Sequence, residues 1–144
     1  MIHLASPADA GVIASLAQKL WGHHDVQELT TEFEALIAQN DAAVFLCTVQ
    51  DHPIGFAQCQ LRYDYVEGTS SSPVGYLEGI FVEESYRRQG WSRTLLAACQ
   101  TWARLQGCSE FASDCELSNA ESLAFHLAAG FEEANRIICF TKKL

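Results

Sequence analysis

Two carboxylates lie where acid–base chemistry is expected. Glu78 interrupts the apolar run Leu77–Val82, and Asp114 directly follows a second short run, Phe111–Ser113. A buried carboxylate needs a partner or water, and ligand crevices form at the carboxyl ends of strands. If the two strands are neighbours, both acids face one crevice, where paired carboxylates can serve acid–base chemistry. The structural alternative is that Glu78 pairs with an arginine and Asp114 caps the loop after its strand.

A basic turn containing a glycine follows the Glu78 strand. Arg87-Arg88-Gln89-Gly90 precedes a helical pattern that extends to Gly107, with an apolar face formed by Leu95, Leu96, Cys99, Trp102 and Ala103. Free N–H groups and the dipole at a helix N-terminus bind pyrophosphate. Many strand–turn–helix joints contain arginine and glycine, so the turn alone leaves phosphate binding as one interpretation.

The histidines and cysteines do not predict a metal site. His23 and His24 have no third partner in the sequence and are expected in a solvated loop. The six cysteines contain no C-x-x-C pair, and no secretory leader precedes them. They are therefore expected to be reduced and mostly buried as small hydrophobic residues: Cys47, Cys59, Cys99, Cys108, Cys115 and Cys139.

Alternating strands and helices must position these residues. Strands are expected at residues 1–5, 42–49, 54–65, 75–82, 110–115, 131–135 and 137–142, and helices at 6–21, 25–39, 90–107 and 118–130. Helix starts are indicated by Ser6 before Pro7, by Asp25-x-x-Glu28 and Thr31-x-x-Glu34, and by Ser118-x-x-Glu121. This order predicts one α/β domain over residues 1–144, with a mixed, mostly antiparallel sheet flanked by helices.

Composition narrows the classes of function. The 144 residues are 49% hydrophobic and 19% charged, which predicts a globular chain, and no apolar run is long enough to span a membrane. The N-terminus has no signal-peptide pattern, so a cytoplasmic location is expected. Nine basic against 18 acidic residues give a net charge of −9. Such a surface disfavours nucleic acid and attracts polycations, although it also serves solubility alone.

The basic turn has a spacing that resembles a known family. Arg87-x-x-Gly90-x-Ser92 is similar to the acetyl-CoA signature [Arg/Gln]-x-x-Gly-x-[Gly/Ala] of the GNAT N-acetyltransferases, with Ser92 as a departure. Asn119, His126 and Gly130-Phe131 hold the positions of an Asn, a Tyr and a Gly-Phe pair common in that family. The expected order of elements also resembles the GNAT fold over nearly the whole chain.

The resemblance implies acetyl-CoA as co-substrate, with no metal. The backbones of Ile80 and Val82 would pair with the pantetheine arm, and the Val82 N–H would polarise the thioester carbonyl. The N–H groups from Arg88 to Arg93 would hold the pyrophosphate. His126 would protonate the leaving thiolate, or would only pack on its helix. The implied cofactor residues are Ile80, Phe81, Val82, Arg88, Gln89, Gly90, Trp91, Ser92, Arg93 and Asn119.

Longer motifs resemble the small aminoglycoside 6'-N-acetyltransferases. They are Trp21, residues 62–68, residues 71–74, residues 77–82, residues 111–114 and residues 130–133. In that family the positions of Trp21, Tyr65, Glu78 and Asp114 line the aminoglycoside pocket, although Trp21 and Tyr65 are also candidates for core aromatics. A further pocket acid of some members is replaced here by Asn135.

The resemblance implies transfer of an acetyl group to the 6'-amine of aminoglycosides, and hence antibiotic resistance. Direct attack in a ternary complex is expected, because no cysteine has the partners of an acyl carrier. Glu78 is the candidate base, and Asp114 is the second pocket acid and alternative base. Two other functions stay open: acetylation of a polyamine or protein N-terminus, and a non-catalytic acyl-CoA sensor. An exposed C-terminal strand could serve a homodimer.

Overall fold

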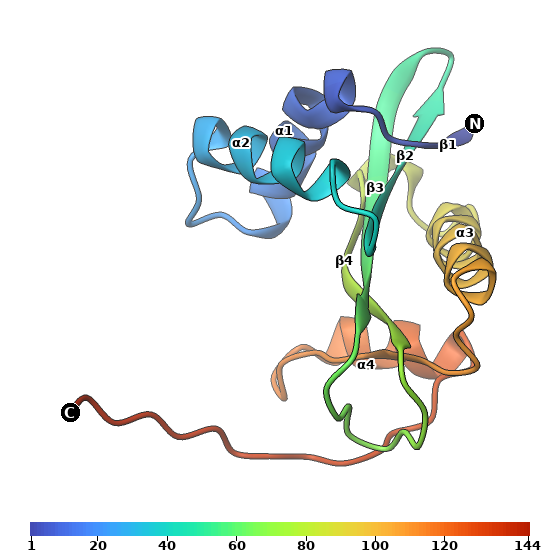
Figure 1. Ribbon diagram of the computed structural model, residues 1–144. Helices are drawn as coiled ribbons and strands as arrows, with labels where there is room; N and C mark the ends of the chain where they lie inside the picture. Colours follow the sequence, from blue (N-terminus) through green and yellow to red (C-terminus); the bar gives the residue numbers. More distant parts are fainter.

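The computed structural model describes residues 1–144 and is built around a five-stranded sheet (Figure 1). The strands lie in the order β1-β2-β3-β4-β5, and all neighbours are antiparallel except β4 and β5, which are parallel. The strands are β1 (Ile2–Leu4), β2 (Ala42–Val49), β3 (His52–Arg62), β4 (Val74–Val82) and β5 (Phe111–Ser113). The helices are α1 (Ala10–Leu20), α2 (Val26–Ile37), α3 (Trp91–Leu105) and α4 (Ala120–Ala128), with 3-10 helices η1 (Pro7–Asp9) and η2 (Glu84–Tyr86). The predicted mixed, mostly antiparallel sheet flanked by helices is confirmed.

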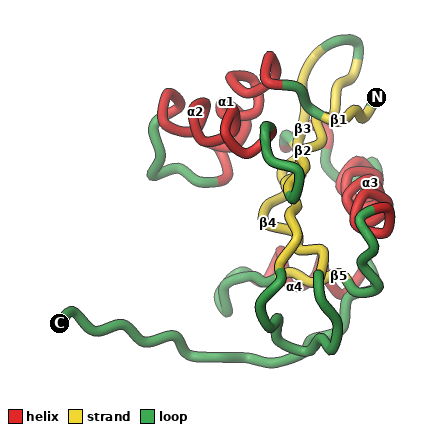
Figure 2. The backbone as a smooth tube through the Cα atoms, viewed as in Figure 1, coloured by secondary structure: helices red, strands yellow, loops and turns green.

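Helices cover both faces of the sheet (Figure 2). Alternation along β2 sends Val44 and Leu46 into a core shared with α1 and α2, and sends Ala43 and Cys47 into a core shared with α3. Each fully buried large aliphatic or aromatic side chain contributes about 1.5–3 kcal/mol. The two cores therefore hold β2, β3 and β4 firmly between the helix pair and α3.

The N-terminal helix starts later than the sequence predicts. Ser6 does form a capping box with Asp9, and the Ser6 N–H donates to Asp9 Oδ2 at 2.8 Å. That hydrogen bond lowers the pKa of the Asp9 carboxyl. The box closes η1, however, and the α-helix itself runs from Ala10 to Leu20. Asp25 precedes α2 as expected, whereas Thr31 lies inside that helix rather than at its start.

Strand ends also differ from the predicted ones. β3 runs from His52 to Arg62 and stops before Tyr65, because its pairing with β4 ends at Arg62 opposite Val74. β5 is limited to Phe111–Ser113, the stretch that pairs with β4. Strand propensity extends beyond both strands, but a strand ends where its partner stops supplying hydrogen bonds.

The predicted final strand pair, 131–135 and 137–142, is wrong. After Gly130 the chain runs away from the sheet (Figure 1), and no backbone N–H from 132 onward donates to a backbone carbonyl. Ile137, Ile138 and Phe140 are 69%, 80% and 88% exposed. We call residues 132–144 the C-terminal arm. Its pattern is typical of a strand, yet no strand of the sheet lies beside it.

The cysteines follow this division of the chain. Cys47, Cys59, Cys99 and Cys108 are buried as predicted, and burial raises the pKa of the Cys47 and Cys108 thiols. Cys139, predicted to be buried, is exposed because it lies on the C-terminal arm. All six cysteines are free thiols.

Candidate active site

A β-bulge in β4 sets the direction of the Glu78 side chain. Cys59 of β3 pairs with Leu77 and Gln58 pairs with Gly79, so Glu78 is an extra residue between two rungs. A bulge turns two successive residues toward one face. Glu78 and Gly79 accordingly both face the α1–α2 side. The bulge therefore explains how a carboxylate fits into an apolar strand.

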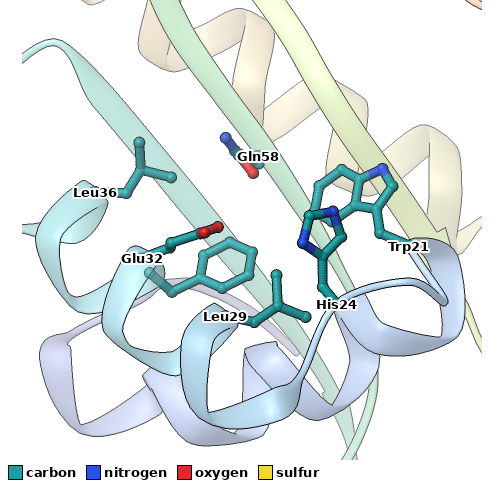
Figure 3. Close-up of a pocket in the computed structure, with 7 residues that line it drawn as sticks. Trp21, His24, Leu29, Glu32, Leu36 and Gln58 are labelled. Carbon is teal, nitrogen blue, oxygen red and sulfur yellow. The ribbon is translucent and has the colours of Figure 1, made fainter.

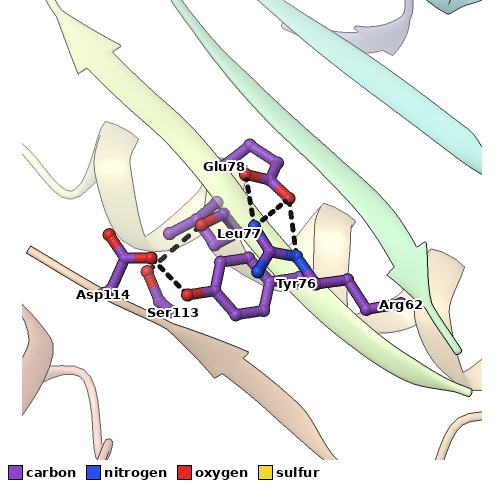
Figure 4. A network of polar contacts seen from close by, with 6 residues as sticks. All are labelled: Arg62, Tyr76, Leu77, Glu78, Ser113 and Asp114. Atoms are coloured by element: carbon purple, nitrogen blue, oxygen red, sulfur yellow. Dashed lines mark hydrogen bonds and ion pairs between the residues drawn. The ribbon is translucent and has the colours of Figure 1, made fainter. Parts of the chain in front are cut away.

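Glu78 belongs to a polar cluster that spans β3, β4 and β5 (Figure 4). The Arg62 guanidinium donates to both carboxylate oxygens of Glu78, with Nη2 at 2.9 Å from Oε1 and 3.1 Å from Oε2, and Nε at 3.1 Å from Oε1. The same guanidinium lies 3.5 Å over the Tyr76 ring. The Tyr76 hydroxyl donates to Asp114 Oδ2. Two acids and one cation give this cluster a net charge of −1.

Tyr76 joins the two carboxylates and remains a hydrogen-bond donor. Burial, followed by the hydrogen bond to the Asp114 carboxylate, raises the pKa of Tyr76 well above its ordinary value. The condition set out from the sequence is met: β4 and β5 are neighbours, since Tyr76 pairs with Ala112 one rung before Leu77 pairs with Ser113. The acids at the two strands are thereby brought into one cluster.

Arg62 and Tyr76 were not identified as site residues from the sequence. The alternative that Glu78 pairs with an arginine is what the structure contains, but it did not specify which arginine. A signal did exist for Tyr76, because it lies two residues before Glu78 and so shares its face of the strand. Arg62 could be found only from the register of β3 against β4, where it pairs with Val74.

Trp21 lies beside the bulge. Its indole covers Gly79, where an added Cβ would come within 2.6 Å of Trp21 Cζ2, and its ring centroid is 6.0 Å from that of Phe56. Trp21 also borders a cavity of about 330 Å³ on the α1–α2 side (Figure 3). The lining residues are Trp21, His24, Leu29, Glu32, Phe33, Leu36 and Gln58. The half-buried Trp21 side chain thus both packs against the core and lines the cavity.

Tyr65 is not a core residue, since 76% of its surface is exposed in the loop between β3 and β4. This loop is tied to the start of β5, because Glu110 accepts hydrogen bonds from the Ser70 N–H at 2.9 Å and from the Ser71 hydroxyl. These bonds lower the pKa of Glu110. Tyr65 therefore lies in an anchored loop, but none of its side-chain atoms bonds to the polar cluster.

β4 has an open edge after the bulge. The Glu83 N–H donates to Ile54 O of β3 at 2.7 Å, and backbone direction alternates along an antiparallel pair. Ile80 and Val82 therefore direct their backbone groups away from β3. β5 ends at Ser113 opposite Leu77, so no strand covers that side. We call Gly79–Val82 the open edge; the outward backbone groups of Ile80 and the N–H of Val82 are available to an extended ligand.

The basic turn after the open edge also has free N–H groups. No hydrogen bond is donated by the backbone N–H of any residue from 88 to 93, and α3 has no side-chain cap. Arg88 and Gly90 have positive φ values of 60° and 88°, a geometry that directs successive N–H groups into a concavity. No atom lies within 4 Å of a Cβ built on Gly90. The turn therefore presents free N–H groups beside open space, at the place where the motif predicts phosphate binding.

Arg87 connects the turn to the open edge. Its Nε donates to Val82 O at 2.9 Å, and its Nη1 lies 3.8 Å from Glu121 of α4. Val82 consequently keeps only its N–H for a ligand. Asn119 is committed as well: its Oδ1 accepts the Ser122 N–H at 3.0 Å and caps α4, so the helix begins one residue later than the predicted Ser118 cap.

His126 lies on α4 at the end of the β4–β5 pairing. Its Nδ1 is 2.7 Å from Ser122 O, and its Nε2 is 2.9 Å from Ser113 Oγ. Ser113 Oγ also lies 3.2 Å from Leu77 O, on the last rung of the β4–β5 pairing. The imidazole is thus bonded to β5 at the point where the open edge of β4 begins.

This arrangement agrees with a family assignment. The model of the Acetyltransferase (GNAT) family matches residues 13–131, which include the polar cluster, the open edge and the turn. The chain belongs to the GNAT family. Two aminoglycoside N(6')-acetyltransferases type 1 are similar to this GNAT protein. That of Stenotrophomonas maltophilia is 44% identical, with 99% of this chain and 93% of the relative covered. That of Serratia marcescens is 40% identical, with 90% of each covered.

Solved structures extend the similarity to the fold. AAC(6')-Iy in complex with the bisubstrate analogue CoA-S-monomethyl-acetylneamine superposes with a TM-score of 0.95 at 36% identity, covering 100% of this chain and 98% of that chain. AAC(6')-Ih from Acinetobacter baumannii superposes with a TM-score of 0.93 at 37% identity, with the same coverage. In this GNAT protein no helix is both long and apolar enough to cross a bilayer, and no three metal-ligating side chains gather.

Proposed function

We propose that this GNAT protein transfers the acetyl group of acetyl-CoA to the 6'-amine of aminoglycosides by direct attack, and so confers resistance to them. The observation that carries the proposal is the position of two carboxylates, Glu78 and Asp114, directly beside the open edge of β4. Such a site binds a cationic amine next to a ligand that pairs with the strand. The similarity to aminoglycoside N(6')-acetyltransferases over nearly the whole chain supports the same substrate.

The residues present fit acetyl-CoA. The free N–H groups of residues 88–93 would hold the pyrophosphate, and Gly90 leaves room for its approach. The pantetheine arm would pair with the open edge, first at Val82, which is nearer the turn, and then at Ile80. Acetyl-CoA supplies the activated thioester carbonyl that the amine attacks.

The order of groups along this edge changes one expectation from the sequence. The sequence resemblance points to the Val82 N–H as the donor to the thioester carbonyl. Val82, however, lies at the turn, whereas Ile80 directly follows Gly79, the residue that Trp21 covers, and is two residues from Glu78 at the bulge. Because the acetyl group is the far end of the pantetheine arm, we assign the carbonyl to the Ile80 N–H and leave Val82 to the arm.

The polar cluster would bind and deprotonate the amine. A carboxylate offers about four acceptor positions, and Arg62 makes three contacts with Glu78. Glu78 thus retains capacity to accept the proton of the ammonium group, directly or through one water. Asp114 would orient a second cationic group, and is the alternative base. Trp21 and Tyr65 would supply aromatic surface to the sugar rings.

A thiol-release assay tests this function. Purified protein with acetyl-CoA would be offered kanamycin, spermidine or a peptide with a free N-terminus. We expect thiol release with kanamycin to exceed that with the other two amines, with acetylation at the 6'-amine established by NMR of the product. Faster release with spermidine or the peptide would refute the aminoglycoside assignment, and binding of acetyl-CoA without release would indicate a sensor.

We also propose that the protein is a homodimer, assembled through the C-terminal arm. The exposed Ile137, Ile138 and Phe140 are unfavourable in water, and β5 has no partner on its outer edge. Sedimentation should give a dimer that Ile138→Lys converts to monomer, whereas Thr141→Lys, the same charge at a polar position of the arm, should not. A monomeric wild type would refute the dimer.

We place this enzyme in the cytoplasm. Six free cysteines are suited to a reducing compartment, and acetyl-CoA is formed inside the cell. Fractionation of cells that produce the protein, followed by immunodetection, should recover it with cytoplasmic markers. Recovery in the periplasm would refute this location.

A further inference from the structure

The hydrogen bonds of His126 define where its protons lie. Nδ1 lies 2.7 Å from the Ser122 carbonyl oxygen and 3.3 Å from Ser122 Oγ; the carbonyl, the nearer group, can only accept, so we assign a proton to Nδ1. Nε2 then either accepts from the Ser113 hydroxyl in the neutral imidazole or donates to Ser113 Oγ in the imidazolium, across the same 2.9 Å. Both ring nitrogens are therefore engaged, and the second proton of His126 is shared with Ser113.

The direction of the Ser113 hydroxyl depends on this second proton. When His126 is neutral, the single hydroxyl hydrogen of Ser113 points to Nε2. When His126 is charged, Nε2–H donates to Ser113 Oγ and the hydroxyl hydrogen is released toward β4, where Leu77 O lies at 3.2 Å. Leu77 is the last β4 residue paired with β5, so this hydrogen emerges where the open edge begins.

We propose that the Ser113 hydroxyl is the group that protonates the departing thiolate, with His126 as its proton source. The inference rests on the proposed function. When the amine attacks the carbonyl carbon, the C–S bond breaks and sulfur leaves with the electron pair. Sulfur takes the hydroxyl hydrogen of Ser113, directly or through one water, and Ser113 Oγ takes the Nε2 proton. His126 becomes neutral and regains a proton from solvent before the next cycle.

The charged groups near His126 are engaged elsewhere. Asp114, directly after β5, accepts from Tyr76, and Glu78 of β4 binds Arg62. The remaining neighbours are Arg93 of α3, which donates to Ala128 O at 3.1 Å, Glu121 of α4, which faces Arg87, and the rings of Phe125 and Phe131 at 5.6 and 5.1 Å. No carboxylate contacts the imidazole, so its exchangeable proton is shared with Ser113 alone.

Two measurements test the relay. The first is the tautomer of neutral His126, read from ¹⁵N chemical shifts of the ring in the free protein. The structure requires the Nδ1–H form, whereas free histidine in water prefers Nε2–H. The second is the dependence of kcat on pH, measured with whichever of kanamycin, spermidine or the peptide supports thiol release. Because the relay needs a proton on Nε2 of His126, wild-type kcat should fall on the alkaline side.

Ser113→Ala should lower kcat by more than about tenfold and abolish the alkaline fall, since general-acid loss typically costs about 10²–10⁴ in rate. Ser113→Thr keeps the hydroxyl and should restore both, and Ser109→Ala, the same change at an exposed serine, should alter neither. His126→Phe should match Ser113→Ala, and the double variant should be no slower than either. An Nε2–H tautomer of neutral His126, or an alkaline fall of kcat that is unchanged in Ser113→Ala, would overturn the relay. The proposed function would still stand in that case, provided that the wild type is active. If no amine supports thiol release, the proposed function and the relay fail together.

Discussion

Substitution of Gly79 by alanine should disturb the acceptor side of the site through one contact. A Cβ at this position would lie 2.6 Å from Trp21 Cζ2 and 2.8 Å from Cη2. Optimal carbon–carbon contacts are about 3.5–4.0 Å, so the indole must move by about 1 Å. The backbone of Gly79 needs no positive φ, and the effect is therefore purely steric.

The size of the effect follows from overpacking. Extra methyl groups in a packed core cost about 1–3 kcal/mol, which for a chain of this length lowers Tm by about 3–10 °C. A misplacement of about 1 Å can lower turnover by about 10². We therefore expect kcat/KM for kanamycin to fall by about 10²-fold in Gly79→Ala, while the KM for acetyl-CoA stays within about twofold.

Calorimetry and steady-state kinetics measure these changes. Gly11→Ala is the matched control, because no atom lies within 4 Å of its added Cβ and alanine favours the helix; its Tm should not fall. Trp21→Phe replaces the two-ring indole with a single smaller ring and so removes the Cζ2 and Cη2 atoms that the new Cβ would meet. The Gly79→Ala/Trp21→Phe protein should therefore recover most of the Tm lost in Gly79→Ala. If Gly79→Ala had the same Tm and the same kcat/KM as the wild type, the fixed position of Trp21 over β4 would be refuted.

Three further predictions concern the turn, the acids and the N-terminal cap. Acetyl-CoA should raise Tm because it binds only the folded chain. Gly90→Val places a branched residue at φ 88° in the turn proposed to bind pyrophosphate, and should abolish this rise in Tm. An unchanged rise in Tm would refute the pyrophosphate assignment. Glu78→Gln should mainly lower kcat, by about 10²–10⁴, and Asp114→Asn should mainly raise KM for kanamycin; the opposite pattern would exchange their roles. Asp9→Asn should lower Tm at pH 7, because the Asp9 carboxyl has a lowered pKa in the folded protein and its charged form stabilises the fold. This stabilisation is present above the ordinary pKa range of carboxyl groups and is lost as pH falls through the folded pKa, so wild type and Asp9→Asn should have equal Tm near pH 2. A difference in Tm that stays constant with pH would contradict this linkage.

The parts of this site that follow from local sequence could be predicted. The Arg87–Ser92 turn is specified by residues adjacent in the chain, and its open N–H groups depend on φ values that Gly90 readily adopts. The neighbouring strands of Glu78 and Asp114 could also be anticipated, since an apolar strand, a helix and a second short strand predict a parallel pair.

Features that depend on long-range pairing could not be predicted. The Arg62–Glu78 ion pair joins residues 16 apart through the register of β3 with β4, and the bulge that aims Glu78 is itself a property of that register. The Ser113–His126 contact needs the packing of α4 on β5. The C-terminal arm was misassigned for the same reason, because its apolar pattern indicates a strand but does not indicate whether a neighbouring strand pairs with it.

The bulge at Glu78 also limits how this sequence can change during evolution. Upstream of the bulge, the odd-numbered residues of β4 direct their backbone N–H and C=O groups toward β5, as the hydrogen bond from Gly75 N–H to Glu110 O shows. Downstream of the bulge, it is the even-numbered residues whose backbone groups point to the same side, which is there the open edge. Deletion of a single residue here would reverse every later position. Phe81 would leave the α1–α2 core and Val82 would leave the α3 core, while the free backbone groups turned inward. We therefore expect relatives to tolerate exchanges of residue type in this stretch but no change in the number of residues between Leu77 and Val82.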